Sequence, residues 1–104
     1  MTLKRREKRR YISIVHSGVA QDAFSTLERR HAELFGSAAF ARAAMRLLLS
    51  VDNVMMVRCS LSQVRGVLVA IALADPAMTT LDMSSSMKRL KRRAVKVNTA
   101  GRTS

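Results

Sequence analysis

A chain of 104 residues is long enough for a single domain. Its composition, 48% hydrophobic and 25% charged residues, is typical of a folded globular protein and not of a disordered segment. Its one cysteine, Cys59, excludes an internal disulfide and disfavours a zinc site, as expected in a reducing compartment. The apolar runs at residues 12–15 and 66–74 are too short for a signal-peptide core and for a membrane span of about 20 residues. We therefore expect a soluble, intracellular protein that does not bind membranes.

The formal net charge of +12 is concentrated at the two ends of the chain. The first ten residues hold six bases and one acid, and residues 88–104 hold seven bases and no acid. Residues 11–87 are neutral, with six arginines and six acids. A neutral body with two cationic ends indicates a polyanionic partner near the termini. The RNA-binding candidates are Lys4, Arg5, Arg6, Lys8, Arg9, Arg10, Lys88, Arg89, Lys91, Arg92 and Arg93.

The first half of the chain predicts a strand followed by two helices. Residues 11–16 are rich in β-branched side chains, and Ser17-Gly18 ends this strand. Apolar residues then recur at helical spacing up to Phe35, with His31 on the same stripe. Gly36 is suited to close this helix, and a short second helix extends to Ala44.

The second half predicts two strands, a helix and a last strand. Residues 46–51 and 54–59 flank a turn at Asp52-Asn53. Residues 60–63 have the form of a capping box, which opens a helix that Pro76 must end. The last strand, residues 79–84, should turn Leu81 and Met83 inward. The residues after it show only weak helical patterning.

This order, βα(α)ββαβ, predicts an α+β fold. It is that of a ferredoxin-like two-layer sandwich, as in RNA-recognition domains, with a four-stranded antiparallel sheet. We expect a basic arm at residues 1–10, a core domain at 11–87 and a basic tail at 88–104. In this topology the first and last strands are antiparallel neighbours, so both basic segments should emerge at one edge as a single cationic patch.

No catalytic, cofactor-binding or metal-binding residues emerge from the sequence. His31 lies on a packing stripe and His16 at a strand end, and neither has an acid at a spacing typical of a triad. The acids are scattered singly, and the four glycines form no phosphate loop. We expect no intrinsic enzyme activity.

The predicted sheet favours a protein partner over stacked bases. RNA-recognition domains stack bases on aromatics of their central strands, whereas residues 54–59 contain none, and only Tyr11 could lie on the open face. A face rich in Met and Val suits another protein. The candidates for this interface are Leu47, Leu49, Met55 and Val57.

Three segments in order resemble the component 2 family of archaeal and eukaryotic ribonuclease P. Leu34-Phe35-Gly36 closes a long helix, and Val57-Arg58-Cys59-Ser60 ends a strand before the next helix. Residues 83–89 match a family segment with an apolar residue, Ser-Gly-Thr, an aliphatic residue and two bases, except that Ser85 and Ser86 replace Gly and Thr. The resemblance covers nearly the whole chain.

The resemblance implies a non-catalytic subunit of ribonuclease P, which matures the 5′ end of precursor tRNA. The implied partners are the catalytic RNA, precursor tRNA indirectly, and a TIM-barrel-like protein subunit, in a heterotetramer with two copies of each. Magnesium would be bound by the RNA, and no cofactor by the protein. The location would be cytoplasmic for an archaeal protein, and nuclear or nucleolar for a eukaryotic one.

Three other classes of function remain open. Another RNA-bound structural protein, such as a ribosomal protein, would have the same composition. A ferredoxin-like enzyme or small-molecule sensor would need a polar pocket or a site shared across a dimer. Attachment to an anionic membrane through the basic ends would need bulky apolar residues among the charges, and Leu3 alone is a poor anchor.

Overall fold

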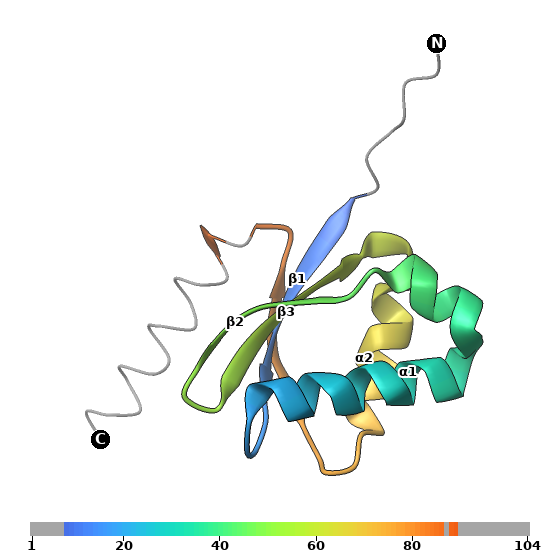
Figure 1. The fold of residues 1–104 in the computed structure, drawn as a ribbon. Helices are drawn as coiled ribbons and strands as arrows, with labels where there is room; N and C mark the ends of the chain where they lie inside the picture. The colour runs from blue at the N-terminus through green and yellow to red at the C-terminus, as the bar shows by residue number, and fades with distance from the viewer. Residues whose placement is uncertain (1–7, 87, 90–104) are drawn as a thin grey trace.

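The computed structural model describes residues 8–86, 88 and 89, which form a four-stranded sheet with two helices (Figure 1). In chain order the elements are β1 (Arg9–Val15), α1 (Ala20–Ala43), β2 (Arg46–Val51), β3 (Val54–Ser60), the 3₁₀ turn η1 (Leu61–Gln63), α2 (Val64–Ala72) and β4 (Thr79–Ser84). The strand order is β2-β3-β1-β4, and every neighbouring pair is antiparallel. The predicted ferredoxin-like α+β fold is confirmed.

One face of the sheet packs against both helices and forms the core. Alternate residues of the central strands, Ile12 and Ile14 on β1 and Met55 and Val57 on β3, point to this face and are fully buried. They join apolar side chains of both helices: Phe24, Leu27, Val67, Ala70 and Ile71. The other face of the sheet is not covered by α1 or α2, and we call it the open face.

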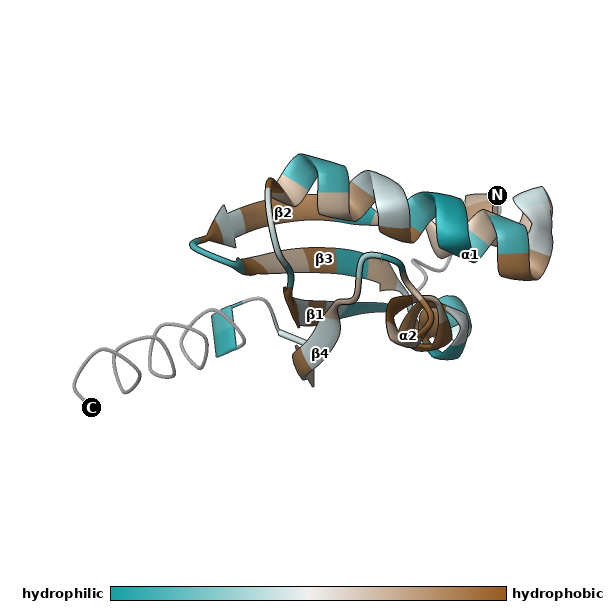
Figure 2. Ribbon diagram, turned by 90° about the horizontal axis from the view of Figure 1, so that it is seen from below, coloured by the Kyte–Doolittle hydropathy of each residue, from teal (hydrophilic) through white to brown (hydrophobic). Residues whose placement is uncertain are grey.

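The two helices differ in how apolar they are (Figure 2). α1 alternates polar and apolar residues, as expected of a helix with one face in water. α2 is apolar along most of its length, and its residue Val69 and Leu73, which follows its end, are exposed. No helix in the described residues is long and apolar enough to cross a membrane.

Gly36 divides α1 into the two predicted helices. Its φ of 89° and ψ of 167° are not helical and form a kink within residues 20–43. A glycine that closes a helix usually has the positive φ and ψ of the left-handed helical region. Gly36 has the positive φ, but its ψ lies outside that region, in a conformation that is essentially restricted to glycine. The chain therefore changes direction at Gly36 without a loop.

The capping box predicted at residues 60–63 is wrong. The hydroxyl of Ser60 makes no cap and donates instead to the carbonyl oxygen of Arg42, at 2.8 Å. This bond ties the end of β3 to the last turn of α1. The chain then enters α2 through η1 rather than through a side-chain cap. α2 ends at Ala72, before the cis Asp75–Pro76 bond.

Leu81 and Met83, both predicted to turn inward, are each 39% exposed. Met83 pairs with Ile12 and therefore lies on the helix side of the sheet, as predicted, but at its exposed edge. Leu81 is the extra residue of a bulge, so its predicted orientation is wrong. β4 is an edge strand, and its pairing with β1 is shifted by a bulge between Ser13 and Ile14. The bulge breaks the regular alternation on which the prediction depended.

Candidate nucleic-acid interface

The start of β1 lies beside the end of β4, as the topology predicted. Tyr11 pairs with Ser84, so the basic residues before β1 and after β4 leave the sheet at the same end (Figure 1). Lys8 and Arg9 are exposed, and Arg10 is half-buried. The carbonyl oxygen of Lys8 accepts a 2.8 Å hydrogen bond from the backbone N–H of Leu61. This bond fixes the chain where it enters the sheet.

Serine side chains shape the turn that follows β4. The backbone N–H of Ser86 donates to the Ser84 hydroxyl at 3.1 Å, and the N–H of Arg89 donates to the Ser86 hydroxyl at 3.3 Å. The second bond has the geometry of a helix N-cap, and Lys88 and Arg89 have helical backbone. Ser86, which stands where the family has Thr, therefore caps the helical turn that contains Lys88 and Arg89.

Two arginines of the neutral body complete this basic end of the sheet, and sequence reasoning missed both. Arg58, near the end of β3, pairs with Tyr11 on one side and with Arg46, at the start of β2, on the other. Cross-strand partners lie on the same face, so all three are on the open face. A regular hairpin continuing the pairing of Val51 with Val54 would set Arg46 opposite Cys59. The bulge between Leu47 and Leu49 shifts it to Arg58.

Three of the six acids of the neutral body lie toward the other end of the sheet. Asp52 is in the β2–β3 turn, Asp75 is in the connection that leads into β4, and Asp22 is in the first turn of α1, soon after β1 ends. The arginines of the sheet, Arg46 and Arg58, thus lie where the basic termini emerge, and these three acids lie at the opposite end. This separation strengthens the local positive potential that attracts a polyanion.

The candidates for a protein interface divide between the two faces. Met55 and Val57 are fully buried against the helices, so the prediction that they are exposed is wrong. Leu47 pairs with Val57 and packs against the same core. Leu49 pairs with Met56 on the open face and is half-buried. The bulge in β2 explains why Leu47 and Leu49 point to opposite faces.

The titratable residues of the interior are structural rather than reactive. His31 is fully buried on the predicted stripe, beside the rings of Phe35 and Phe40, and burial lowers its pKa. Its ring nitrogens have no hydrogen-bond partner. His16 lies at the β1 terminus with Nδ1 3.4 Å from the Ser17 carbonyl oxygen. Burial raises the pKa of the Cys59 thiol to about 11, which keeps it protonated and unreactive at neutral pH.

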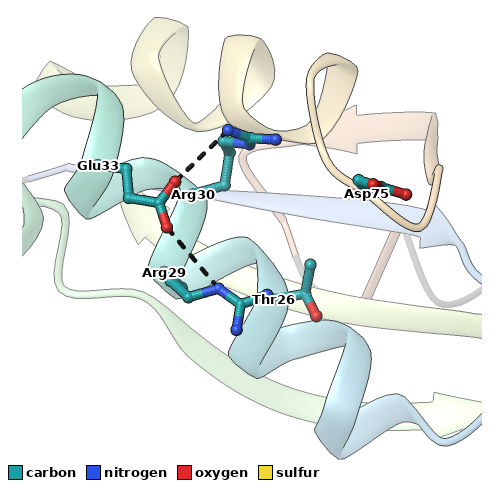
Figure 3. Close-up of a pocket in the computed structure, with 5 residues that line it drawn as sticks. All are labelled: Thr26, Arg29, Arg30, Glu33 and Asp75. Atoms are coloured by element: carbon teal, nitrogen blue, oxygen red, sulfur yellow. Dashed lines mark hydrogen bonds and ion pairs between the residues drawn. The ribbon is translucent and has the colours of Figure 1, made fainter.

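A polar pocket of about 370 Å³ lies between α1 and the connection after α2 (Figure 3). Glu33 lies between two arginines in it, with its carboxylate 3.8 Å from Arg29 Nε and 3.4 Å from an Arg30 guanidinium nitrogen. Thr26 and Asp75 complete the lining. The lining offers no histidine or cysteine as a general base or nucleophile. Nor do the described residues include a cluster of three potential metal ligands.

The remaining predicted contacts lie outside the described residues. These are Lys4, Arg5 and Arg6 of the arm, and Lys91, Arg92 and Arg93 of the tail. The basic end that the structure describes therefore consists of Lys8, Arg9, Arg10, Arg46, Arg58, Lys88 and Arg89, with Tyr11 among them.

Comparison with known proteins finds a structural relative but no sequence relative. No family model and no curated protein matches the sequence. A chain in the cryo-EM structure of yeast ribonuclease MRP matches the fold with a TM-score of 0.61. The match covers 98% of this chain and 100% of the yeast chain, at 13% sequence identity. The two chains therefore share a fold.

Proposed function

We propose that this protein is a non-catalytic subunit of a ribonucleoprotein of the ribonuclease P type, and that its basic end binds the RNA. The pairing of Tyr11 with Ser84 carries the proposal, because it brings the two chain segments that bear the bases to the same end of the sheet, where Arg46 and Arg58 also lie. Bases grouped in this way attract a phosphate backbone without reading its sequence.

Two further observations support this proposal. The yeast chain of the same fold comes from ribonuclease MRP, a ribonucleoprotein related to ribonuclease P. The family resemblance of residues 34–36, 57–60 and 83–89 points independently to ribonuclease P. The contribution that we propose for the protein is electrostatic. Neutralising RNA phosphates lets a catalytic RNA fold at lower magnesium concentration.

The finer parts of the proposal concern its partners. The protein would bind the ribonuclease P catalytic RNA directly and precursor tRNA indirectly, with magnesium held by the RNA. It would pair with a TIM-barrel-like protein subunit, in a heterotetramer with two copies of each. Leu49 and the neighbouring exposed Val51 of the open face are the apolar residues that such a partner could contact. The complex would work in the cytoplasm of an archaeon, or in the nucleus or nucleolus of a eukaryote.

The decisive experiment purifies the tagged protein from its native cell and sequences the RNA bound to it. We expect a ribonuclease P-type RNA, and magnesium-dependent cleavage of precursor tRNA by the purified particle. The protein alone should cleave nothing, even at high concentration. A variant with Lys8, Arg9 and Arg10 changed to Gln is the control, since it should recover less RNA.

Two results would overturn the proposal. Ribosomal RNA as the bound species would identify a ribosomal protein instead. Cleavage by RNA-free protein that persists through repeated purification would identify an enzyme.

A further inference from the structure

Four side chains of the basic end share the open face of the sheet. Arg46, Arg58 and Tyr11 are cross-strand partners on β2, β3 and β1. Arg9 is two residues before Tyr11 and therefore points to the same face. Adjacent strands lie about 4.8 Å apart, so the four form a compact group across three strands. Ile12 and Ile14 confirm the assignment, because they point the opposite way into the helical core.

The stability of the fold does not account for this group. Like charges directly opposite each other on neighbouring strands are destabilising, and Arg46 opposite Arg58 is such a pair. Among the described residues, the ion pairs involve Arg29 and Arg30 with Glu33, and not the arginines of this face. Arg58 is in addition half-buried, which partly removes its charge from water. An external anion would relieve both costs.

We propose that this face binds an unpaired RNA strand, with a base stacked on Tyr11 and the flanking phosphates on Arg9, Arg46 and Arg58. The inference rests on the RNA-binding function proposed above and specifies the form of RNA. The faces of bases inside a duplex are already stacked, whereas unpaired bases stack on aromatic rings and on guanidinium planes. Tyr11, between Arg58 and Ser84 at the end of the sheet, is half-buried and therefore keeps part of its surface accessible.

The rest of the open face limits the length of the contact. Ser13 and Met56, the next cross-strand pair beyond Tyr11 and Arg58 on this face, are 0% and 2% exposed. A strand of RNA therefore cannot reach them, and the contact is confined to the end of the sheet, at one or two nucleotides. The absence of aromatic residues from β3 argued against bases stacked along the sheet, and it remains consistent with stacking on Tyr11 alone.

The sequence provides a direct optical probe of this contact. Tyr11 is the single tyrosine of the chain and there is no tryptophan, so the tyrosine emission of the protein comes from Tyr11. A stacked base quenches such emission. The experiment titrates the full chain with an oligouridylate, which has no stable secondary structure, and in parallel with an RNA duplex of equal length.

We expect the oligouridylate to quench the emission, and Tyr11→Leu to weaken its binding roughly tenfold, as measured by anisotropy of a labelled RNA. Tyr11→Phe should retain the affinity, since phenylalanine also stacks. The double variant Arg46→Gln, Arg58→Gln should weaken binding, while Arg65→Gln, at an exposed position of α2, should not. Thermal melts of each variant verify that it is folded.

The outcomes separate this inference from the function on which it rests. If RNA binds without quenching and without sensitivity to Tyr11, Arg46 or Arg58, the unpaired-strand site is wrong and the general RNA-binding role stands. Equal or greater effects of these variants on the duplex would also overturn the site. If neither RNA binds the full chain, both the site and the proposed function are wrong.

Discussion

His31 and Gly66 are in van der Waals proximity where α1 crosses α2: a Cβ added to Gly66 would lie 3.2 Å from His31 Nε2. Glycine in a helix costs about 1 kcal/mol relative to alanine, so the close approach of the two helices is what favours it here. The contact buries the imidazole completely, between Gly66, Phe35 and Phe40.

Gly66→Ala should therefore destabilise the protein despite the better helix propensity of alanine. Overpacking costs about 1–3 kcal/mol, and His31 has no exposed side toward which to move. In a His31→Ala background the same substitution should become stabilising by about 1 kcal/mol, because the crowding is gone. Urea unfolding of the four proteins measures this cycle. A stabilising Gly66→Ala in the native background would show that the helix contact is loose.

The stability of the protein should fall as the pH is lowered below about 6.5. Burial lowers the pKa of His31 from its ordinary value of 6.5, so the unfolded chain binds a proton that the folded chain rejects. Above pH 6.5 the stability that comes from keeping His31 neutral is fully present. As the pH falls from 6.5 toward the pKa of folded His31, the free energy of unfolding decreases by up to about 1.4 kcal/mol per pH unit. Chemical unfolding between pH 5 and 7.5 should show this slope in the native protein. His31→Leu should remove the part due to His31, and an unchanged slope would contradict the assignment.

Leu49→Asp and Val57→Asp form a matched pair that tests the assignment of the two faces of the sheet. Val57→Asp puts an unpaired carboxylate into the core and should unfold the domain, at a cost above about 3 kcal/mol. Leu49→Asp should leave the fold intact and weaken association with the proposed protein partner. Circular dichroism and co-purification separate the two effects. If Leu49→Asp leaves assembly unchanged, the open face near β2 does not bind that partner.

The fold was predictable because the strong periodic signals were local. The strand at the start of the chain, the kink at Gly36, the Asp52-Asn53 turn and the antiparallel pairing of β1 with β4 all follow from residue type and standard topology. The element bounds differ from the prediction by at most a few residues.

The predictions that failed depended on register. Bulges in β2 and β4 shift the pairing by one residue, and a one-residue shift moves a side chain to the other face of a sheet. For this reason the pairing of Arg46 with Arg58 was not foreseen. Met55 and Val57 were misplaced for another reason: residues 54–57 of β3 are all apolar, so no alternation with polar residues marks which of them face the core. The capping role of Ser60 failed for a tertiary reason, because its hydroxyl bonds to Arg42 from a distant element.

The central claim is that the two basic ends form one RNA-binding surface, and the salt dependence of RNA affinity tests it most directly. Two variants are compared with the native protein: Lys8, Arg9 and Arg10 changed to Gln, and Lys88, Arg89 and Lys91 changed to Gln. Each phosphate contact contributes roughly 0.7–0.9 to the slope of log affinity against log salt concentration. We expect each variant to flatten the slope by a similar amount, up to roughly 2–3. Arg29→Gln, at an exposed position of α1 away from the basic end, serves as the single-charge control and should leave the slope unchanged. A slope carried entirely by one end, with no change on neutralising the other, would contradict the account.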